Sequence, residues 1–408
     1  VVHTNGTTGL SSKENYIVDP VEDVSGDFDE NDFTWDAADP SRVTGLTSRG
    51  KMKLLNNGRN LVIPNRAKKV GANAFNNENI SSVRADAVVE IEREGFNSNP
   101  LSSVIMPALT TIGDQAFSNN ISNAGATKLQ NFDFSHVTSI GRMAFYSAGL
   151  SGNLNLPLLT SVPESAFTNN TITSVNAPNL TSIGQNGFLN NSLSSVDSSQ
   201  FPALTTIAGG AFQGSTNLKS IALPESLKYI ENSTFADCIN LEGIFIPKSV
   251  EYIGISAFSN CKSLTEIEIP NLIVNVRSWA FSGCEKLERV ELPKSLKQID
   301  SEAFSDCIEL KSIVIPSQVK QIEWAAFSGC INLEDIKFES SPEYIGCAFK
   351  DTKFYNNIKE DEYGCKYVGN HLIEVVDKER RKIIIKEGTV SIANHAFYQS
   401  KIDNVIFP

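Results

Sequence analysis

Several residue types and patterns that specify common functions are scarce in this chain. Its 408 residues include only four histidines, and no two of them are spaced like a pair of metal ligands. The sequence contains no phosphate-binding loop, no nucleophile elbow and no zinc motif. It also lacks an apolar run of about 18 residues, the length needed to cross a membrane. We therefore expect neither a metalloenzyme, nor a nucleotide-binding enzyme, nor insertion into a membrane.

Positive charge is also in short supply. Lys and Arg number 35 against 47 Asp and Glu, so the net charge is −12 at pH 7. Residues 19–39 alone carry nine carboxylates and no basic side chain. Nucleic acids and anionic lipids attract basic surfaces, because basic side chains displace their counterions. We therefore expect neither of them as the main partner.

Cysteine is absent from the first half of the chain. All seven cysteines lie between Cys238 and Cys365, and an odd number excludes complete disulfide pairing within one chain. In an exported protein, free thiols would indicate an anaerobic habitat. The chain begins at Val1 rather than at Met. We therefore expect a processed or shortened form, from which any export signal has been removed.

What the sequence does contain is a repeated pattern built around phenylalanine. Most members of the series are 21 to 24 residues apart, and five consecutive steps from Phe212 to Phe327 are 23. In thirteen of the fourteen units an Ile or Val precedes the Phe by five positions. A fixed period of this length is the signature of a repeat protein. The series consists of Phe75, Phe96, Phe117, Phe145, Phe167, Phe188, Phe212, Phe235, Phe258, Phe281, Phe304, Phe327, Phe349 and Phe397.

Each full unit in the second half of the chain combines a short strand with a turn. The pattern L-x-x-I-x-I-P is followed by V or L, and then by I-G-x-x-A-F-x-x-C. The I-x-I alternation predicts a strand with one face inward, and the Pro ends it because proline cannot donate to a ladder. Each unit should therefore form one coil of a solenoid. Fourteen coils stacked in parallel about 4.8 Å apart would extend over roughly 65 Å, with equivalent Ile, Leu and Phe side chains in contact.

Five of the cysteines recur at one position of the repeat, the third after the Phe, where earlier units have Asn. Such a position is expected to be buried at a tight turn, where Asn bonds to the backbone and Cys acts as a small apolar residue. We interpret these cysteines as structural rather than as reactive thiols or metal ligands, because stacked cysteines suit neither a relaxed disulfide nor tetrahedral zinc. The residues at this position include Asn99, Asn120, Asn170, Asn191, Cys238, Cys261, Cys284, Cys307 and Cys330.

The repeat resembles that of a known family. The Asn or Cys that closes L-x-x-I-x-I is similar to that of leucine-rich repeats. Over residues 61–408, I-G-x-x-A-F-x-x-C with I-x-I-P resembles the BspA-like, or Treponema pallidum type, leucine-rich repeats. The resemblance implies a leucine-rich repeat solenoid of about 14 coils of 21–24 residues, made mostly of short parallel strands and irregular structure. It also implies an extracellular or cell-surface bacterial protein without catalytic residues, some relatives of which bind host matrix proteins or other cells.

The first coil needs a cover, because a solenoid end otherwise leaves apolar surface and unpaired strand edges in water. We expect residues 1–40 to form an acidic, poorly ordered leader and residues 41–60 to form a cap helix. In that helix, Leu46, Met52 and Leu55 can share the buried face, with Thr47 or Ser48 as the N-cap.

A calcium loop is a further possibility within the acidic leader. Asp27, Asp29, Asn31 and Asp32 hint at such a loop, because the first three of them have the spacing of its first ligands. The sixth position lacks Gly, however, and the twelfth is Ala38 where Glu is needed. We therefore expect no metal there.

The regular repeats cover residues 61–349, and the pattern then breaks. The step from Phe349 to Phe397 is 48 residues, about 25 more than one coil. Two apolar strands flank a charged turn at residues 377–381, which predicts a protruding hairpin or a degenerate coil, and we favour the hairpin. We assign residues 350–385 to this insertion and residues 386–408 to a final, truncated repeat.

Function must lie on outward residues, because inward residues are committed to packing. The middle residue of each I-x-I should be exposed, and two groups of these stand out. One is a polar ladder that could hold a cation or sugar hydroxyls, and the other is a Phe beside two acidic residues, which would suit a protein ligand with a basic patch. A solvated face without a ligand is the alternative for both. The ladder comprises Asp133, Asn155, Asn176 and Asp197, and the second group comprises Phe245, Glu268 and Glu291.

Three functions are compatible with this pattern. The first is a recognition or adhesion module that binds a host matrix or cell-surface protein, a glycan or another microbial cell through its strand face. The second is a stalk that presents another domain, and the third is a glycoside hydrolase whose paired carboxylates lie among the many acidic residues. We favour the first, as a non-catalytic monomer without a cofactor. Trp279 and Trp324, near the turns, are expected to pack rather than to bind.

Overall fold

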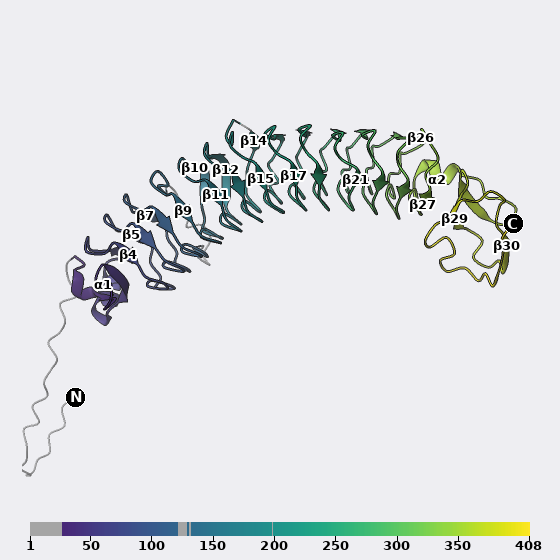
Figure 1. Ribbon diagram of the computed structural model, residues 1–408. Coiled ribbons are helices and arrows are strands. Elements are labelled where there is room, and N and C mark those ends of the chain that lie inside the picture. The colour runs from purple at the N-terminus through teal and green to yellow at the C-terminus, as the bar shows by residue number, and fades with distance from the viewer. Residues whose placement is uncertain (1–26, 121–128, 130–131, 198) are drawn as a thin grey trace, which may run out of the picture.

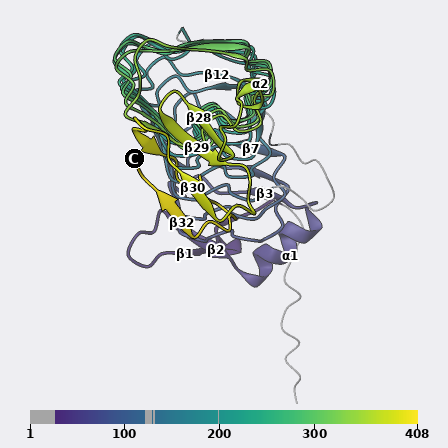
Figure 2. The ribbon, with the colours of Figure 1, turned by 90° about the vertical axis from the view of Figure 1, so that its right-hand side faces the viewer.

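The chain folds into an elongated array of stacked coils. The computed structural model describes residues 27–120, 129, 132–197 and 199–408, so residues 1–26 of the expected leader lie outside the described part. Figure 1 shows the coils side by side along a curved axis, with α1 (Ser48–Asn56) and β30 (Lys382–Ile384) at opposite ends. Figure 2 looks along the array, and the outlines of successive coils overlap. The predicted solenoid with short parallel strands is confirmed.

Two series of strands run along the array, one strand of each series in most coils. The first series is the predicted I-x-I strand. It consists of β3 (Asn60–Val62), β5 (Ser82–Arg84), β7 (Ser103–Ile105), β10 (Ser151–Asn155), β12 (Thr171–Asn176), β14 (Ser195–Asp197), β16 (Ser220–Ala222), β18 (Gly243–Phe245), β20 (Glu266–Glu268), β22 (Arg289–Glu291), β24 (Ser312–Ile315), β26 (Asp335–Phe338), β30 and β32 (Asn404–Ile406).

The second series contains two residues per coil and ends at the Ile or Val that precedes the Phe by five positions, or by four in the case of Ile345. Most neighbouring members pair in parallel with equivalent positions of the repeat facing each other, as Ile299 faces Ile322. The series consists of β4 (Lys69–Val70), β6 (Glu90–Ile91), β8 (Thr111–Ile112), β9 (Ser139–Ile140), β11 (Ser161–Val162), β13 (Ser182–Ile183), β15 (Thr206–Ile207), β17 (Tyr229–Ile230), β19 (Tyr252–Ile253), β21 (Asn275–Val276), β23 (Gln298–Ile299), β25 (Gln321–Ile322), β27 (Tyr344–Ile345) and β31 (Ser391–Ile392).

Thirteen phenylalanines, from Phe75 to Phe349, form one continuous row in the core, which we call the phenylalanine row. Neighbouring rings are stacked with centroids 5.2 to 6.0 Å apart, and none of these side chains is more than 1% exposed. At the two ends, Phe33 and Phe354 meet the row edge to face. The expected fourteenth member, Phe397, is not part of the row and packs in a separate C-terminal core.

The turn that carries each Phe forms a third ladder between coils. The N–H of Phe258 donates to the carbonyl of Ala280 in the next coil at 2.8 Å, and the N–H of Asn260 donates to the carbonyl of Ser282 at 2.7 Å. Residues two positions before and after the Phe adopt positive φ, as at Asn260 with φ 59°. Because left-handed and right-handed backbone conformations alternate along the turn, every second N–H points toward the neighbouring coil. This conformation favours Gly, Asn and Asp, which recur at the later of the two positions.

The Asn or Cys position joins consecutive coils by a hydrogen bond to the same acceptor. Nδ2 of Asn191 and Sγ of Cys261 both donate to the Phe carbonyl of the preceding coil, at 2.8 and 3.3 Å. Oδ1 of Asn191 also accepts from the N–H of Ile172. Coils with Cys have one more residue here, so the equivalent N–H of Leu264 bonds instead to the carbonyl of Cys261 at 3.0 Å. A thiol is sufficient there because the turn needs only a donor.

We expect the column of cysteines to resist chemical modification in the folded protein. Burial raises the pKa of Cys238 and Cys284 to about 12, and raises that of Cys261 well above its usual value. The thiolate is the reactive form, so little of it is present at pH 8. Titration with Ellman's reagent should detect all seven thiols only after denaturation. Rapid reaction of any native thiol other than the half-buried Cys347 would contradict this assignment.

A cap covers the first coil, and it begins earlier than the sequence suggested. Residues 30–35, which we assigned to a poorly ordered leader, form η1 (Glu30–Asp32) and β1 (Phe33–Trp35). The latter pairs antiparallel with β2 (Arg42–Leu46), which pairs in turn with β4. The leader assignment is therefore wrong for these residues. Their apolar side chains close the core, since Phe33 is 3% exposed.

Helix α1 has Thr47 as its N-cap, but it buries a different face from the expected one. Met52 and Leu55 are about half exposed, whereas Leu54 and Lys53 are buried. Burial of a lysine requires a charged partner, which the preceding acidic residues supply. This pairing also uses the carboxylates that we considered as calcium ligands, because Asp32 contacts Lys53 and Arg49.

The insertion after Phe349 contains a hairpin, but not at the charged turn. After α2 (Lys353–Asn357), strands β28 (Cys365–Val368) and β29 (His371–Val375) pair antiparallel. The connection is Gly369–Asn370, with Gly369 at φ 57°. Two-residue turns made of Gly and Asn match the twist of paired strands. Residues 377–381 contain neither Gly nor Asn. The predicted position of the hairpin is therefore wrong.

The degenerate coil that we considered as the alternative is also present, and it includes β29. This strand pairs in parallel with β31, so that Leu372 faces Ile392 in the second strand series. Val375 takes the position of the Phe in this coil. Its N–H donates to the carbonyl of Ala396 at 2.8 Å, just as the N–H of Phe327 donates to the carbonyl of Ala348. A valine does not fill the space of a phenylalanine, which explains why the phenylalanine row ends one coil earlier.

Candidate functional site

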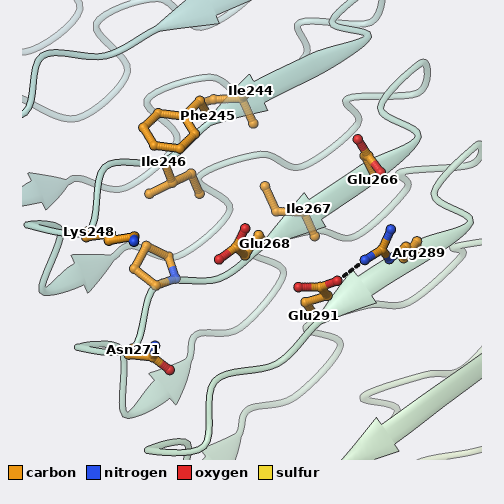
Figure 3. A pocket seen from close by; sticks show the side chains of 11 residues that line it. Ile244, Phe245, Ile246, Lys248, Glu266, Ile267, Glu268, Asn271, Arg289 and Glu291 are labelled. Carbon is orange, nitrogen blue, oxygen red and sulfur yellow. Dashed lines mark hydrogen bonds and ion pairs between the residues drawn. The ribbon is translucent and has the colours of Figure 1, made fainter.

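The second group of predicted site residues lines one groove on the outer surface of the first strand series. Phe245, Glu268 and Glu291 are the last residues of β18, β20 and β22, and the alternation of each strand points them outward. Together with Lys248 and Arg289 they line a hollow of about 650 Å³. Figure 3 shows the three predicted side chains on successive strands, facing the same side. We call this hollow the strand-face groove.

The strand-face groove combines an apolar side chain with negative charge. Phe245 is 56% exposed. Glu268 faces Glu291 in the parallel register of β20 and β22, and like charges directly opposite each other are destabilising. Arg289 forms an ion pair with Glu291, as Figure 3 shows, whereas no ion pair of Glu268 occurs among the described residues. The groove therefore leaves one carboxylate available beside an exposed aromatic ring.

A second hollow continues the groove over the next coils. It has a volume of about 350 Å³ and shares Arg289 and Glu291 with the first. Its walls include Val314, which is 47% exposed, and Glu339. Along β18, β20, β22 and β24 the outward side chains are thus an apolar one, two acidic ones and a second apolar one.

Sequence reasoning missed the two basic residues of the strand-face groove. Lys248 follows the strand-ending proline of its coil, and Arg289 begins the strand that Glu291 ends. Residues two apart on a strand lie on the same face, so the pairing of Arg289 with Glu291 could have been recognised from their spacing. The position of Lys248 depends on the course of the turn and gave no such signal.

The structure brings together only part of the predicted polar ladder. Nδ2 of Asn176 donates to Oδ1 of Asn155 at 2.8 Å. The ladder stops there, because β12 pairs with β10, whereas β14 pairs with β16. The carboxylates of Asp133 and Asp197 instead accept from backbone N–H groups two residues further on, which lowers the pKa of both. The described residues contain no group of three or more metal-ligating side chains.

Two carboxylates on the second strand series bear on the hydrolase alternative. Burial raises the pKa of Asp300 and of Glu323, which lie in neighbouring coils just after β23 and β25. Arg277 is 3.5 Å from Asp300. Neither carboxylate lines the hollows described above. A glycosidase needs a substrate cavity around its two carboxylates, and the two hollows described above do not supply one for this pair.

Fold and surface together define a leucine-rich repeat solenoid with a charged strand face. A family model described as the BspA type leucine rich repeat region, in 6 copies, matches residues 54–169, 138–265 and 228–359. The chain belongs to this family of bacterial surface proteins. No curated protein matches the chain. Of the part of the chain that the structure describes, no helix has the length and apolar character required to span a bilayer.

Three solved structures of bacterial proteins are similar to this chain. A leucine rich cell surface protein from Faecalibacterium prausnitzii is 24% identical, covers 77% of this chain and 95% of its own, and has a TM-score of 0.51. A leucine-rich repeat protein from Bacteroides ovatus is 22% identical over 81% of this chain and 93% of its own, with a TM-score of 0.49. The pneumococcal vaccine antigen PcpA is 15% identical over 85% of this chain and 88% of its own, with a TM-score of 0.44.

Proposed function

We propose that this chain is a non-catalytic recognition module of the bacterial cell surface, which binds a protein partner through the strand-face groove. The observation that carries the proposal is the exposed ring of Phe245 beside the facing carboxylates of Glu268 and Glu291. Aromatic side chains that become buried are the main anchors of protein interfaces. The partner that fits presents an apolar side chain followed by one or two basic side chains.

Electrostatics favours such a partner in two ways. A basic side chain placed between Glu268 and Glu291 would relieve the repulsion of their carboxylates. The net charge of −12 would also attract a basic partner from solution and accelerate the encounter. Binding should therefore weaken as the salt concentration rises, because surface charges are screened over about 8 Å at physiological ionic strength.

A stalk function is the second candidate, and the phenylalanine row supports it. The rings stack in unbroken succession through thirteen coils, from Phe75 to Phe349. A solenoid of this kind holds its two ends at a fixed separation. Stalk and recognition functions are compatible, because the stalk depends on the core and recognition depends on the outward side chains.

The binding proposal is tested with a matched pair of double variants. On arrays of extracellular-matrix proteins and of peptides with an apolar residue before Lys or Arg, Phe245→Ala with Glu268→Lys should weaken binding about tenfold or more. The control is Ile105→Ala with Asp197→Lys, which changes an exposed apolar and an exposed acidic residue of the same strand face outside the groove. Equal binding of both variants and the unmodified protein would exclude the strand-face groove as the site.

A further inference from the structure

A second hollow lies where the regular coils meet the C-terminal insertion, and we call it the junction cavity. It has a volume of about 480 Å³, within the range of sites for small molecules. It exists because α2 and the hairpin interrupt the stacking of coils after Phe349. Its walls come from the last regular coils, α2, β29 and the final coil. They include Trp324, Lys350, Tyr355, Glu374, Lys378, His395 and Tyr398.

The junction cavity has flat aromatic walls that remain accessible. Trp324 is 41% exposed and Tyr398 is 61% exposed, so the expectation that Trp324 only packs does not describe it. The ring of His395 is close to both, with its centroid 6.2 Å from that of Trp324 and 5.9 Å from that of Tyr398. His395 occupies one of the positive-φ positions of the repeat, with φ 71°. The backbone of the coil therefore fixes the position from which its side chain projects.

The charged groups of the junction cavity leave an excess of positive charge. The carboxylate of Glu374 is already engaged, because it accepts from the hydroxyl of Tyr355 and lies 3.3 Å from Nζ of Lys378. Lys366 covers the ring of Tyr355 with its Nζ 4.1 Å from the centroid. Among the described residues, no carboxylate lies within ion-pair distance of Lys350. A cationic cavity is unusual for a chain with a net charge of −12.

We propose that the junction cavity binds an acidic sugar, a hexuronic acid or a related monosaccharide that carries a carboxylate. The apolar C–H face of the sugar ring would contact the indole of Trp324 and the phenol ring of Tyr398. Its carboxylate would accept a charge-assisted hydrogen bond from Lys350, and its hydroxyls would reach Glu374 and His395. This site is separate from the strand-face groove, so it does not depend on the protein partner proposed there.

The chemistry of the walls discriminates against other classes of ligand. A neutral sugar would cover the aromatic walls but leave the charge of Lys350 unused. A cation would be repelled by Lys350 and Lys378, although aromatic walls alone would suit it. An acidic sugar uses both the aromatic walls and the lysine, because its ring contacts the first and its carboxylate contacts the second.

The test uses the whole chain with galacturonic acid as the probe and galactose as its neutral match. Galacturonic acid should change tryptophan fluorescence, and Trp324→Phe should abolish this change while Trp279→Phe preserves it. Isothermal titration calorimetry should show galactose binding about tenfold more weakly, the effect of one charge-assisted hydrogen bond. Lys350→Gln should weaken the binding of galacturonic acid by a similar factor. Lys353→Gln is the matched control, since this exposed lysine of α2 is outside the cavity lining.

Several results would overturn the proposal. Equal affinity for galacturonic acid and galactose, or no effect of Lys350→Gln, would remove the role of the carboxylate. Tighter binding of benzoate than of galacturonic acid would assign the cavity to planar aromatic acids instead. If Phe245→Ala abolished sugar binding while Trp324→Phe did not, the sugar would belong to the strand-face groove. None of these outcomes affects binding of a protein partner to that groove.

Discussion

Replacing Phe258 by Ala should lower the free energy of unfolding by about 3–5 kcal/mol, the range for removing a large aromatic side chain from a close-packed core. Its ring is fully buried and stacks on both neighbours, with centroids 5.5 Å from Phe235 and 5.4 Å from Phe281. The space left cannot close easily, because the backbone of this coil is bonded to both neighbours: β19 pairs with β17, β20 pairs with β22, and the turn of the Phe bonds to the turns on either side. The loss therefore includes both the transfer of the ring to water and a cavity.

The same substitution should also divide the solenoid. In a repeat protein each coil contacts mainly its neighbours, so a weak interface in the middle uncouples the two halves. We expect the urea denaturation curve of Phe258→Ala to become broader or biphasic, and limited proteolysis to cut near this coil. Phe245→Ala is the control, since that ring is 56% exposed on the adjacent coil. A loss below about 1 kcal/mol, the usual effect of a surface change, would show that the row is not the main stabilising contact.

Replacing Asp32 by Asn should be similarly damaging, at about 3–5 kcal/mol, because it removes one partner of a buried ion pair. The side chains of Asp32 and Lys53 are 0% and 5% exposed, and Oδ2 of Asp32 lies 3.1 Å from Nζ of Lys53. Oδ1 of the same carboxylate lies 2.6 Å from Nε of Arg49. Without the carboxylate charge of Asp32, buried Lys53 would keep only the half-exposed carboxylate of Asp29, 3.7 Å from its Nζ, so α1 should detach and expose the first coil. Denaturant titration and protease sensitivity at residues 47–57 measure this effect.

Acid should reproduce the effect of Asp32→Asn. Burial by itself raises the pKa of Asp32, but hydrogen bonds from Arg49, from the N–H of Asp29 and from Lys53 outweigh it, so the pKa lies below its ordinary value of 3.8. A group whose pKa is lowered by folding contributes stability that is complete above its unfolded-state pKa and disappears as the pH falls through the folded one. The cap should thus loosen only below about pH 4.

The control for both experiments is Asp86→Asn. Asp86 also contacts an arginine, but the side chains of Asp86 and Arg84 are 41% and 55% exposed. Exposed pairs contribute at most about 1 kcal/mol, so this variant should unfold like the unmodified protein. If Asp32→Asn were equally harmless, or if its stability still fell with acid as steeply as that of the unmodified protein, the buried pair would not hold the cap.

The regular coils were predictable because their contacts recur with the period of the sequence. Phe258 meets a Phe at the same position of each neighbouring coil, so spacing alone indicated the row. Strand alternation likewise predicted that Phe245, Glu268 and Glu291 would face outward. It did not predict that the polar ladder would stop after Asn176, because the pairing of strands can change from one coil to the next.

The sequence by itself determined the repeat, its inward residues and the strand face, since a side chain that stacks on its own equivalent needs no information from elsewhere in the chain. Only the tertiary structure decided the two ends. At one end, Lys53 is buried because Asp32, outside the repeat, lies beside it. At the other, Val375 takes the place of a Phe, and the interrupted stacking opens the junction cavity. These contacts join segments that share no periodic pattern, so the spacing of residues carries no trace of them.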